Sequence, residues 1–291
     1  MKIATAAYPL DVLTSWAQYE DKLAHWVAEA AVQGAELLVF PEYAAMELAT
    51  LDGAEVAGDL ERSLFAVSDK LEEAERLHVK LAAEHNVHIV AGSGPAATES
   101  RPVNRARLIT PTGQIGVQDK QIMTRFEREE WGVIGGNALQ VFDTAIGKIG
   151  ILICYDSEFP LLGRALAECD VICVPSVTET LAGYWRVRIG SMARALENQC
   201  ITAMSSVVGK ADWSEALGQS YGAGGIFCPP DRGFPPTGIL GMREVNAPGW
   251  TVADADLAQV AEVRADGIVL NRRDWQDQIG RDGKAINVAL R

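Results

Sequence analysis

The sequence predicts a single α/β domain in which a mixed sheet, or two sheets, is covered by helices. Three observations predict this fold class. Short apolar runs of strand length alternate with amphipathic helical patterns almost to the end of the 291 residues, and two hairpin patterns lie in the middle. Hydrophobic residues make up 48% of the chain and charged residues 22%, which suffices for a large core. We find no fixed-period repeat and no low-complexity linker, so residues 1–291 are expected to form one domain with an irregular tail from about residue 267.

The first third of the chain is predicted to alternate between strands and helices. The first helical pattern begins at Ser15, a good N-cap, and stops at Gly34, while the second is long and is expected to break near Ser68. The predicted elements are a strand at 2–9, a helix at 15–34, a short buried strand at 35–42, a helix at 60–86 and a strand at 87–93.

Turn residues join strand-length segments after residue 100. A Pro-Thr-Gly turn divides 103–120 into a hairpin, and Ile146-Gly147 divides 138–154 in the same way. The later predicted elements are a helix at 159–170, a strand at 171–176, a helix at 184–200, a strand at 201–208, short strands within the Gly/Pro-rich 209–241, a strand at 250–257 and a last helix over DLAQVAEVRAD.

Charge and hydropathy exclude several classes of partner. A net charge of -13 gives the chain no electrostatic reason to bind nucleic acid or an anionic membrane. No apolar run reaches the length of a membrane span, and Pro9 and Asp11 interrupt the apolar N-terminus before it forms a signal core. We therefore expect a cytoplasmic protein that acts on a small molecule and has reduced thiols, because its five cysteines are odd in number and irregularly spaced.

Three predicted strands end in a reactive side chain, namely Glu42, Lys120 and Cys154. Each has a structural explanation when taken alone: a loop carboxylate, a surface lysine or a core thiol. Together they supply what a thiol needs to attack an amide, because a glutamate takes the proton, a lysine stabilises the oxyanion and a cysteine is the nucleophile. In α/β proteins, ligand-binding and catalytic residues are commonly found at the ends of the strands.

Two other thiol chemistries are weaker alternatives. The four histidines lie on or beside predicted helices in the first third, at no strand end, which disfavours a Cys-His pair. Cys169 and Cys173 are separated by three residues instead of the two typical of redox motifs. No metal-ligand spacing is present, and we expect neither a metal nor an organic cofactor.

Four segments in the right order resemble the motifs of the nitrilase superfamily, the carbon-nitrogen hydrolases. They are LLVFPEYA, VQDKQIMTRFE, IGILICYDSEFP and ARALENQCIT, and all four lie within residues 35–202. The resemblance implies a four-layer α-β-β-α sandwich that pairs through its outer helices into a homodimer or a larger homo-oligomer. It also implies that Glu42 is the general base, Lys120 the oxyanion cation and Cys154 the nucleophile, with the Tyr155 N–H as a second oxyanion donor.

The same resemblance implies a second glutamate shortly after the lysine. Glu127 is the preferred candidate because of its spacing from Lys120, and Glu129 and Glu130 are the alternative candidates. Family members that act on nitriles commonly have tryptophan after the nucleophile, and this chain has Tyr155. The expected activity is therefore hydrolysis of a small amide or an N-carbamoyl compound through a thioester. The alternatives are a nitrilase, or a catalytically silent member that serves as a binding subunit.

The substrate side chain is harder to predict. Tyr184, Trp185 and Arg186 follow the next strand, where the family often builds its pocket, and are the candidate substrate contacts. Arg186 suits a substrate carboxylate; the alternative is that Trp185 packs a helix and Arg186 is solvated. Asp156 and Glu158 are expected to cap the next helix. The sequence leaves the particular amide, the oligomeric state and the acyl acceptor, water or an amine, undetermined.

Overall fold

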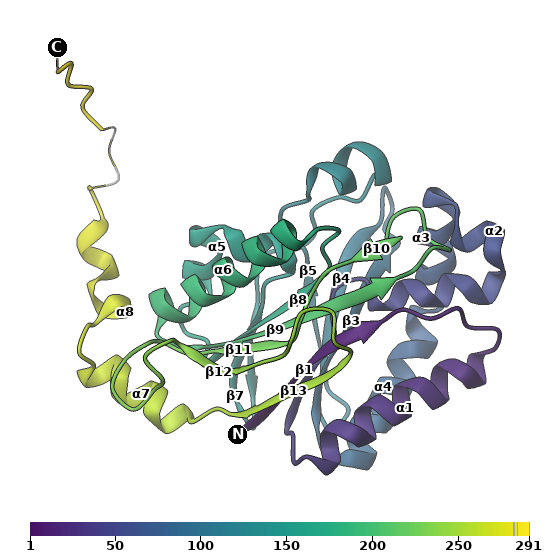
Figure 1. The fold of residues 1–291 in the computed structure, drawn as a ribbon, viewed down its shortest axis with the longest axis horizontal. Helices are drawn as coiled ribbons and strands as arrows, with labels where there is room; N and C mark the ends of the chain where they lie inside the picture. Colours follow the sequence, from purple (N-terminus) through teal and green to yellow (C-terminus); the bar gives the residue numbers. More distant parts are fainter. Residues whose placement is uncertain (282, 284, 291) are drawn as a thin grey trace.

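The strands form two mixed half-sheets in the computed structural model, which describes residues 1–281, 283 and 285–290 (Figure 1). The first half-sheet has the order β5-β4-β3-β2-β1-β13 and the second β6-β7-β8-β9-β11-β12, with β10 beside β9. The strands are β1 Lys2–Pro9, β2 Leu37–Val39, β3 His88–Ala96, β4 Val103–Ile109, β5 Ile115–Asp119, β6 Val141–Thr144, β7 Gly147–Ile151, β8 Val171–Ser176, β9 Ile201–Lys210, β10 Gln219–Ser220, β11 Gly225–Phe227, β12 Ile239–Met242 and β13 Gly249–Asp254.

The two half-sheets are continuous at one point. Ala7 to Pro9 of β1 pair in parallel with Ser206 to Val208 of β9, while the preceding part of β1 pairs with β13. The preceding part of β9 pairs with β11. Along one edge, β1 and β9 each pair with one strand over their first part and with each other over their last part. The half-sheets therefore separate into two layers away from this junction.

Helices cover the outer face of each half-sheet (Figure 1). The helices are α1 Trp16–Val32, α2 Ala54–Ala57, α3 Leu60–Ser68, α4 Leu71–His85, α5 Pro160–Ala165, α6 Leu181–Asn198, α7 Leu257–Asp266 and α8 Asn271–Asp274. Alternate residues of β1 face different layers, because Ala4 and Tyr8 pack among the residues of α1 and α4 whereas Ile3 packs with the second half-sheet. The predicted four-layer α-β-β-α sandwich is therefore confirmed.

Most predicted elements are present, including the break in the long helical pattern, where α3 ends at Ser68 and α4 begins at Leu71. Ser15 caps α1 by accepting a hydrogen bond from the Gln18 N–H. The sequence analysis missed the 3₁₀ helix Ala44–Asp52, which is buried around most of its circumference and so has no amphipathic period.

The C-terminal segment is less irregular than predicted from residue 267 onward. It contains α8 and a 3₁₀ turn, Trp275–Gln278, before the chain leaves the body of the molecule (Figure 1). Residues 282, 284 and 291 of the predicted tail lie outside the described residues. None of the described helices has the length and apolar character needed to cross a membrane.

Candidate active site

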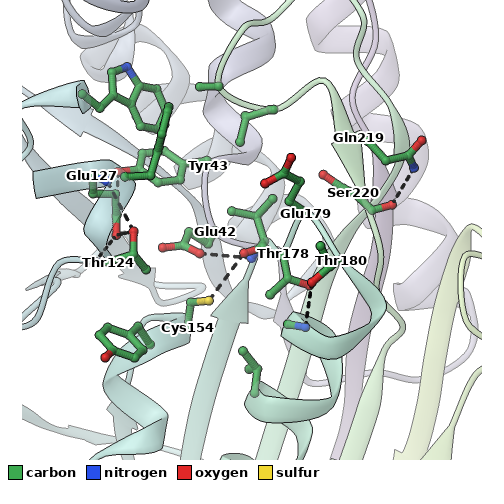
Figure 2. Close-up of a pocket in the computed structure, with 18 of the residues that line it drawn as sticks. Glu42, Tyr43, Thr124, Glu127, Cys154, Thr178, Glu179, Thr180, Gln219 and Ser220 are labelled. Atoms are coloured by element: carbon green, nitrogen blue, oxygen red, sulfur yellow. Dashed lines mark hydrogen bonds between the residues drawn. The ribbon is translucent and has the colours of Figure 1, made fainter. Parts of the chain in front are cut away.

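The three predicted strand-end residues meet at one place between the half-sheets. Glu42 follows β2 and Lys120 follows β5 in the first half-sheet, whereas Cys154 comes from the second, just after β7. Figure 2 shows Glu42 and Cys154 side by side at the cavity. Cys154 has a φ of 48°, in the left-handed region that a non-glycine residue rarely adopts. This sharp turn at the strand end directs the thiol into the cavity and resembles the strained elbows that display nucleophiles in other hydrolase folds.

A buried lysine lies between two buried glutamates. The Lys120 Nζ is 2.8 Å from Glu42 Oε1 and 2.6 Å from Glu127 Oε2. The three side chains are at most 4% exposed. Of the three candidates for the second glutamate, Glu127 is the one in contact with Lys120, while Glu129 pairs with Arg125 at the surface and Glu130 is exposed.

Further hydrogen bonds fix the two glutamates. Asn104 Nδ2 donates to Glu42 Oε1 at 2.9 Å, and the Val177 N–H donates to Glu42 Oε2 at 3.0 Å. The Tyr43 hydroxyl donates to Glu127 Oε1, and the Thr124 N–H and hydroxyl donate to Glu127 Oε2. The sequence pattern does not mark Asn104, Tyr43 or Thr124 as site residues. Tyr43 and Thr124 stand within the glutamate and lysine motifs, whereas Asn104 gives no local signal because strand pairing brings it to the site.

Burial and mutual charge shift the pKa values of these groups. Burial raises the pKa of Glu42 to about 7, against the opposing effect of Lys120. Burial alone would lower the pKa of Lys120, but Glu127 and Glu42 outweigh it and hold that pKa above its ordinary value. Burial, together with the nearby Glu42, raises the pKa of Cys154 well above that of a free thiol. The resting site therefore pairs a neutral thiol with a carboxyl group whose pKa suits proton transfer near neutral pH.

Asp156 has a different role from the helix cap that the sequence suggested. Its buried carboxylate accepts hydrogen bonds from the N–H groups of Gln121 and Ile122, directly after Lys120, and from Ile153, directly before Cys154. Burial raises its pKa to about 6 in spite of these bonds. Asp156 thus ties the lysine loop of one half-sheet to the cysteine turn of the other.

Replacing Asp156 by asparagine is expected to impair both positioning and stability. An amide group turns one acceptor into a donor facing backbone N–H groups, which costs about 1–3 kcal/mol of unfolding free energy. A displacement between Lys120 and Cys154 is expected to lower kcat by about 10- to 100-fold with little change in KM. Asp231→Asn is the matched control, because this carboxylate also accepts backbone N–H groups, from Arg232 and Ile268, away from the cavity. Equal kcat values for the two variants would contradict the positioning role.

A cavity of about 480 Å³ opens onto the thiol. Of the predicted substrate contacts, Tyr155 and Arg186 line it. Glu158 lines it as well and pairs with Arg186, whereas α5 has Phe159 at its N-cap. Tyr184 and Trp185 lie elsewhere. Tyr184 is 1% exposed and packs in the core, and Trp185 faces outward, 45% exposed, with Arg188 over its ring. The reason is helical geometry, since successive residues of α6 turn by about 100° and only part of its circumference faces the cavity.

None of the four histidines lines this cavity. Cys169 and Cys173 are buried thiols, and burial raises their pKa values. The Tyr155 N–H lies in the first turn of the 3₁₀ segment Cys154–Glu158, where a backbone donor has no acceptor within its own helix. This N–H belongs to the residue directly after Cys154.

Comparison with known proteins places these features in a family. A family model described as carbon-nitrogen hydrolase matches residues 2–225. The chain is 33% identical over 282 residues to Probable hydrolase YhcX of Bacillus subtilis (strain 168), covering 96% of this chain and 54% of that protein. It is 34% identical over 177 residues to Nitrilase 3 of Arabidopsis thaliana, covering 55% and 50%, and 28% identical over 191 residues to Omega-amidase YafV of Escherichia coli (strain K12), covering 65% and 66%. The chain thus spans about half the length of the first two relatives.

A solved structure shares the fold. The carbon-nitrogen hydrolase from Helicobacter pylori G27 superimposes with a TM-score of 0.73 at 17% identity, over 97% of this chain and 94% of that one. The family model covers well over half of the chain and includes all four motifs that carry the resemblance in the sequence. The chain therefore belongs to the carbon-nitrogen hydrolase family of the nitrilase superfamily.

Proposed function

We propose that this protein hydrolyses a small amide or N-carbamoyl compound through a thioester on Cys154. The observation that carries the proposal is the convergence of Glu42, Lys120 and Cys154 at a cavity, with Glu127 holding the lysine. A complete set of a base, a cation and a displayed thiol argues against a silent binding subunit. Relatives named omega-amidase support an amide substrate, and a relative named nitrilase makes a nitrile the second candidate.

The first half of the proposed reaction forms the thioester. Glu42 accepts the thiol proton as Cys154 Sγ bonds to the carbonyl carbon, and negative charge develops on the carbonyl oxygen. An ammonium group has three N–H donors, of which Glu42 and Glu127 engage two, so a third donor of Lys120 remains for the oxyanion, together with the Tyr155 N–H. The C–N bond then breaks, and the Glu42 carboxylic acid gives its proton to the departing nitrogen.

The second half releases the acid. Water enters in place of the departed ammonia or amine, Glu42 removes one of its protons, and its oxygen attacks the thioester carbonyl. The same two donors hold the second oxyanion. The C–S bond breaks, and Glu42 returns the proton to the thiolate, which restores the starting state. Glu42 thus acts in turn as base and as acid. Its raised pKa of about 7 suits both roles near neutral pH.

The test is ammonia release from a panel of small amides, N-carbamoyl amines and amino acids, and matched nitriles. Turnover of amides or carbamoyl compounds, with nitriles inert, supports the proposal. Turnover confined to nitriles would replace it with the second candidate. A folded protein that releases ammonia from none of them would overturn it in favour of the silent-subunit alternative.

The pH dependence of kcat/KM is expected to show an acidic limb near pH 7. Glu42 must be ionised to accept the thiol proton, and burial raises its pKa to about 7, so activity rises as pH increases through that value. The rate of Cys154 alkylation by iodoacetamide, an uncharged reagent, is expected to follow the same limb. A limb near the ordinary glutamate pKa of 4.5 in both profiles would contradict the assignment of Glu42 as base.

We also propose that the protein is a homo-oligomer that pairs through α6. Four apolar side chains at spacings of four, four and seven residues lie exposed on one face of this helix, and Leu161 of α5 is exposed beside them. The α6 residues are Leu181, Trp185, Ile189 and Leu196. An apolar stripe of this kind on a surface helix marks an interface. This role replaces the substrate contact predicted for Trp185.

Introducing a charge into this stripe is expected to shift the assembly to monomers. Ile189 is 63% exposed at its centre, so Ile189→Asp places a carboxylate in the proposed interface at little cost to the fold. Val32→Asp is the control, because Val32 is exposed at the far end of α1. The measurement is molar mass by light scattering after size-exclusion chromatography. A wild-type mass equal to one chain would contradict the proposal.

We propose a reducing, cytoplasmic location for the enzyme. All five cysteines are free and buried. The nucleophilic role of Cys154 requires a reduced thiol, which such a compartment maintains.

A further inference from the structure

The outer lining of the active-site cavity carries an excess of negative charge. Beyond the catalytic residues, its ionised side chains are Glu158, Glu179, Glu215 and Arg186. Arg186 Nε lies 3.4 Å from Glu158 Oε1, so these two charges offset each other. Neither Glu179 nor Glu215 has a salt-bridge partner among residues 1–281, 283 and 285–290. Two uncompensated carboxylates therefore remain at the cavity.

Both carboxylates come from loops at the ends of neighbouring strands. Glu179 lies between β8 and α6, and Glu215 lies between β9 and β10. Figure 2 shows Glu179 with Gln219 and Ser220 on the opposite side of the cavity from Thr124 and Glu127. A substrate with its carbonyl at Cys154 thus has Lys120, which contacts Glu127, toward one side and Glu179 toward the other. Glu215 lines the same cavity from the loop that leads to Gln219.

A buried hydroxyl group points to a ligand at the same side. Ser220 is 1% exposed and lines the cavity, yet its Oγ has no hydrogen-bond partner within the described part of the chain. Buried hydroxyl groups are nearly always hydrogen-bonded, so a missing partner calls for an explanation. A hydroxyl oxygen accepts hydrogen bonds, and an ammonium group donates three.

The lining offers little to a substrate carboxylate. Arg186, the predicted partner for one, already pairs with Glu158, and its side chain is 60% exposed. Lys120, the other lining cation among the described residues, is held by two glutamates. Like charges repel, so the two unpaired carboxylates disfavour an anionic side chain in the cavity as well as favouring a cationic one.

We infer that the substrate carries an ammonium group distal to the bond that is cut. The substrate class is an ω-amino amide or an N-carbamoyl diamine, whose ammonium end is bound by Glu179, Glu215 and the Ser220 hydroxyl. This inference rests on the proposed amide-type hydrolysis and assigns the specificity of the same site. The net charge of -13 adds a field that draws cations toward the cavity.

The experiment compares three amides that differ only at the far end: δ-aminovaleramide with an ammonium, hexanamide with a methyl and adipamic acid with a carboxylate. The expected order of kcat/KM is ammonium, then methyl, then carboxylate, with steps of about two- to fivefold, which is the range that an exposed ion pair contributes. Raising the salt concentration is expected to compress the order, because Glu179 and Glu215 are exposed.

Variants then assign the preference to the named groups. Glu179→Gln and Glu215→Gln are each expected to lower the ammonium-to-methyl ratio of kcat/KM by about twofold, and Ser220→Ala by a smaller factor. Glu262→Gln on α7 removes the same charge from an exposed position outside the cavity and is expected to leave that ratio unchanged.

The outcomes separate the two proposals. Hydrolysis of hexanamide that is lost in Cys154→Ala supports the amidase function by itself. Equal rates for the three amides, or a preference for adipamic acid, would overturn the inference and leave that function standing. An ammonium preference that Glu179→Gln, Glu215→Gln and Ser220→Ala all leave intact would also overturn it. If the folded protein turns over no amide, carbamoyl compound or nitrile, both proposals fail.

Discussion

Cys154→Ala is expected to lower kcat for amide hydrolysis by at least roughly 10⁴-fold, since removal of the nucleophile of a covalent mechanism leaves only the effects of binding and of the oxyanion donors. The substitution deletes a single sulfur from a side chain that is 4% exposed at the cavity, so the fold is expected to persist. The measurement is ammonia release by both proteins, with circular dichroism to establish that the variant is folded.

Cys228→Ala is the matched control for Cys154→Ala. Cys228 is also buried and free, but it lies after β11 and does not line the cavity, so its loss is expected to leave turnover intact. Mass spectrometry after rapid quenching provides a second readout, because the wild type is expected to carry an acyl adduct on the peptide that contains Cys154. Hydrolysis by Cys154→Ala at the wild-type rate would exclude the thioester route.

The three reactive strand ends are predictable from the sequence because their signal is local. Glu42, Lys120 and Cys154 each follow an apolar run of strand length, and the motif resemblance adds order and spacing. The residues that hold these three side chains in place have no local signal, because they act through contacts between distant parts of the chain. Asn104 reaches Glu42 across a sequence separation of 62 residues, and Asp156 joins two loops from separate half-sheets. Such contacts depend on strand register and layer packing, which no short window of sequence encodes.

The substrate residues show a second limit of sequence reasoning. Tyr184, Trp185 and Arg186 are adjacent in the chain, yet one packs in the core, one faces outward and one lines the cavity. The helical period predicts that they diverge, but not which of them faces the site, because the packing of α6 on the second half-sheet decides its rotation. Glu215 lies in a loop between β9 and β10 whose position the sequence pattern does not predict.

Lys120→Met is expected to cost both activity and stability. The apolar side chain removes the proposed oxyanion cation and leaves Glu42 and Glu127 buried without their shared counter-charge. Loss of one partner of a buried ion pair costs about 3–5 kcal/mol of unfolding free energy. Denaturant titration measures this loss. Lys120→Met combined with Glu127→Gln is the companion variant, because it removes one of the two carboxylates that Lys120→Met leaves without a counter-charge. It is expected to regain part of the stability and none of the turnover.

The stability of Lys120→Met is expected to depend on pH with a defined sign. Without the lysine, burial and mutual repulsion raise the pKa values of both carboxyl groups in the folded state above the 4.5 of an exposed glutamate. The folded variant then binds more protons than the unfolded chain above pH 4.5, so its stability falls as pH rises through the folded pKa values. The deficit relative to wild type is therefore expected to be smaller at pH 5 than at pH 8. A deficit that is the same at both pH values would show that Lys120 stabilises the fold by packing, and that the two glutamates do not depend on its charge.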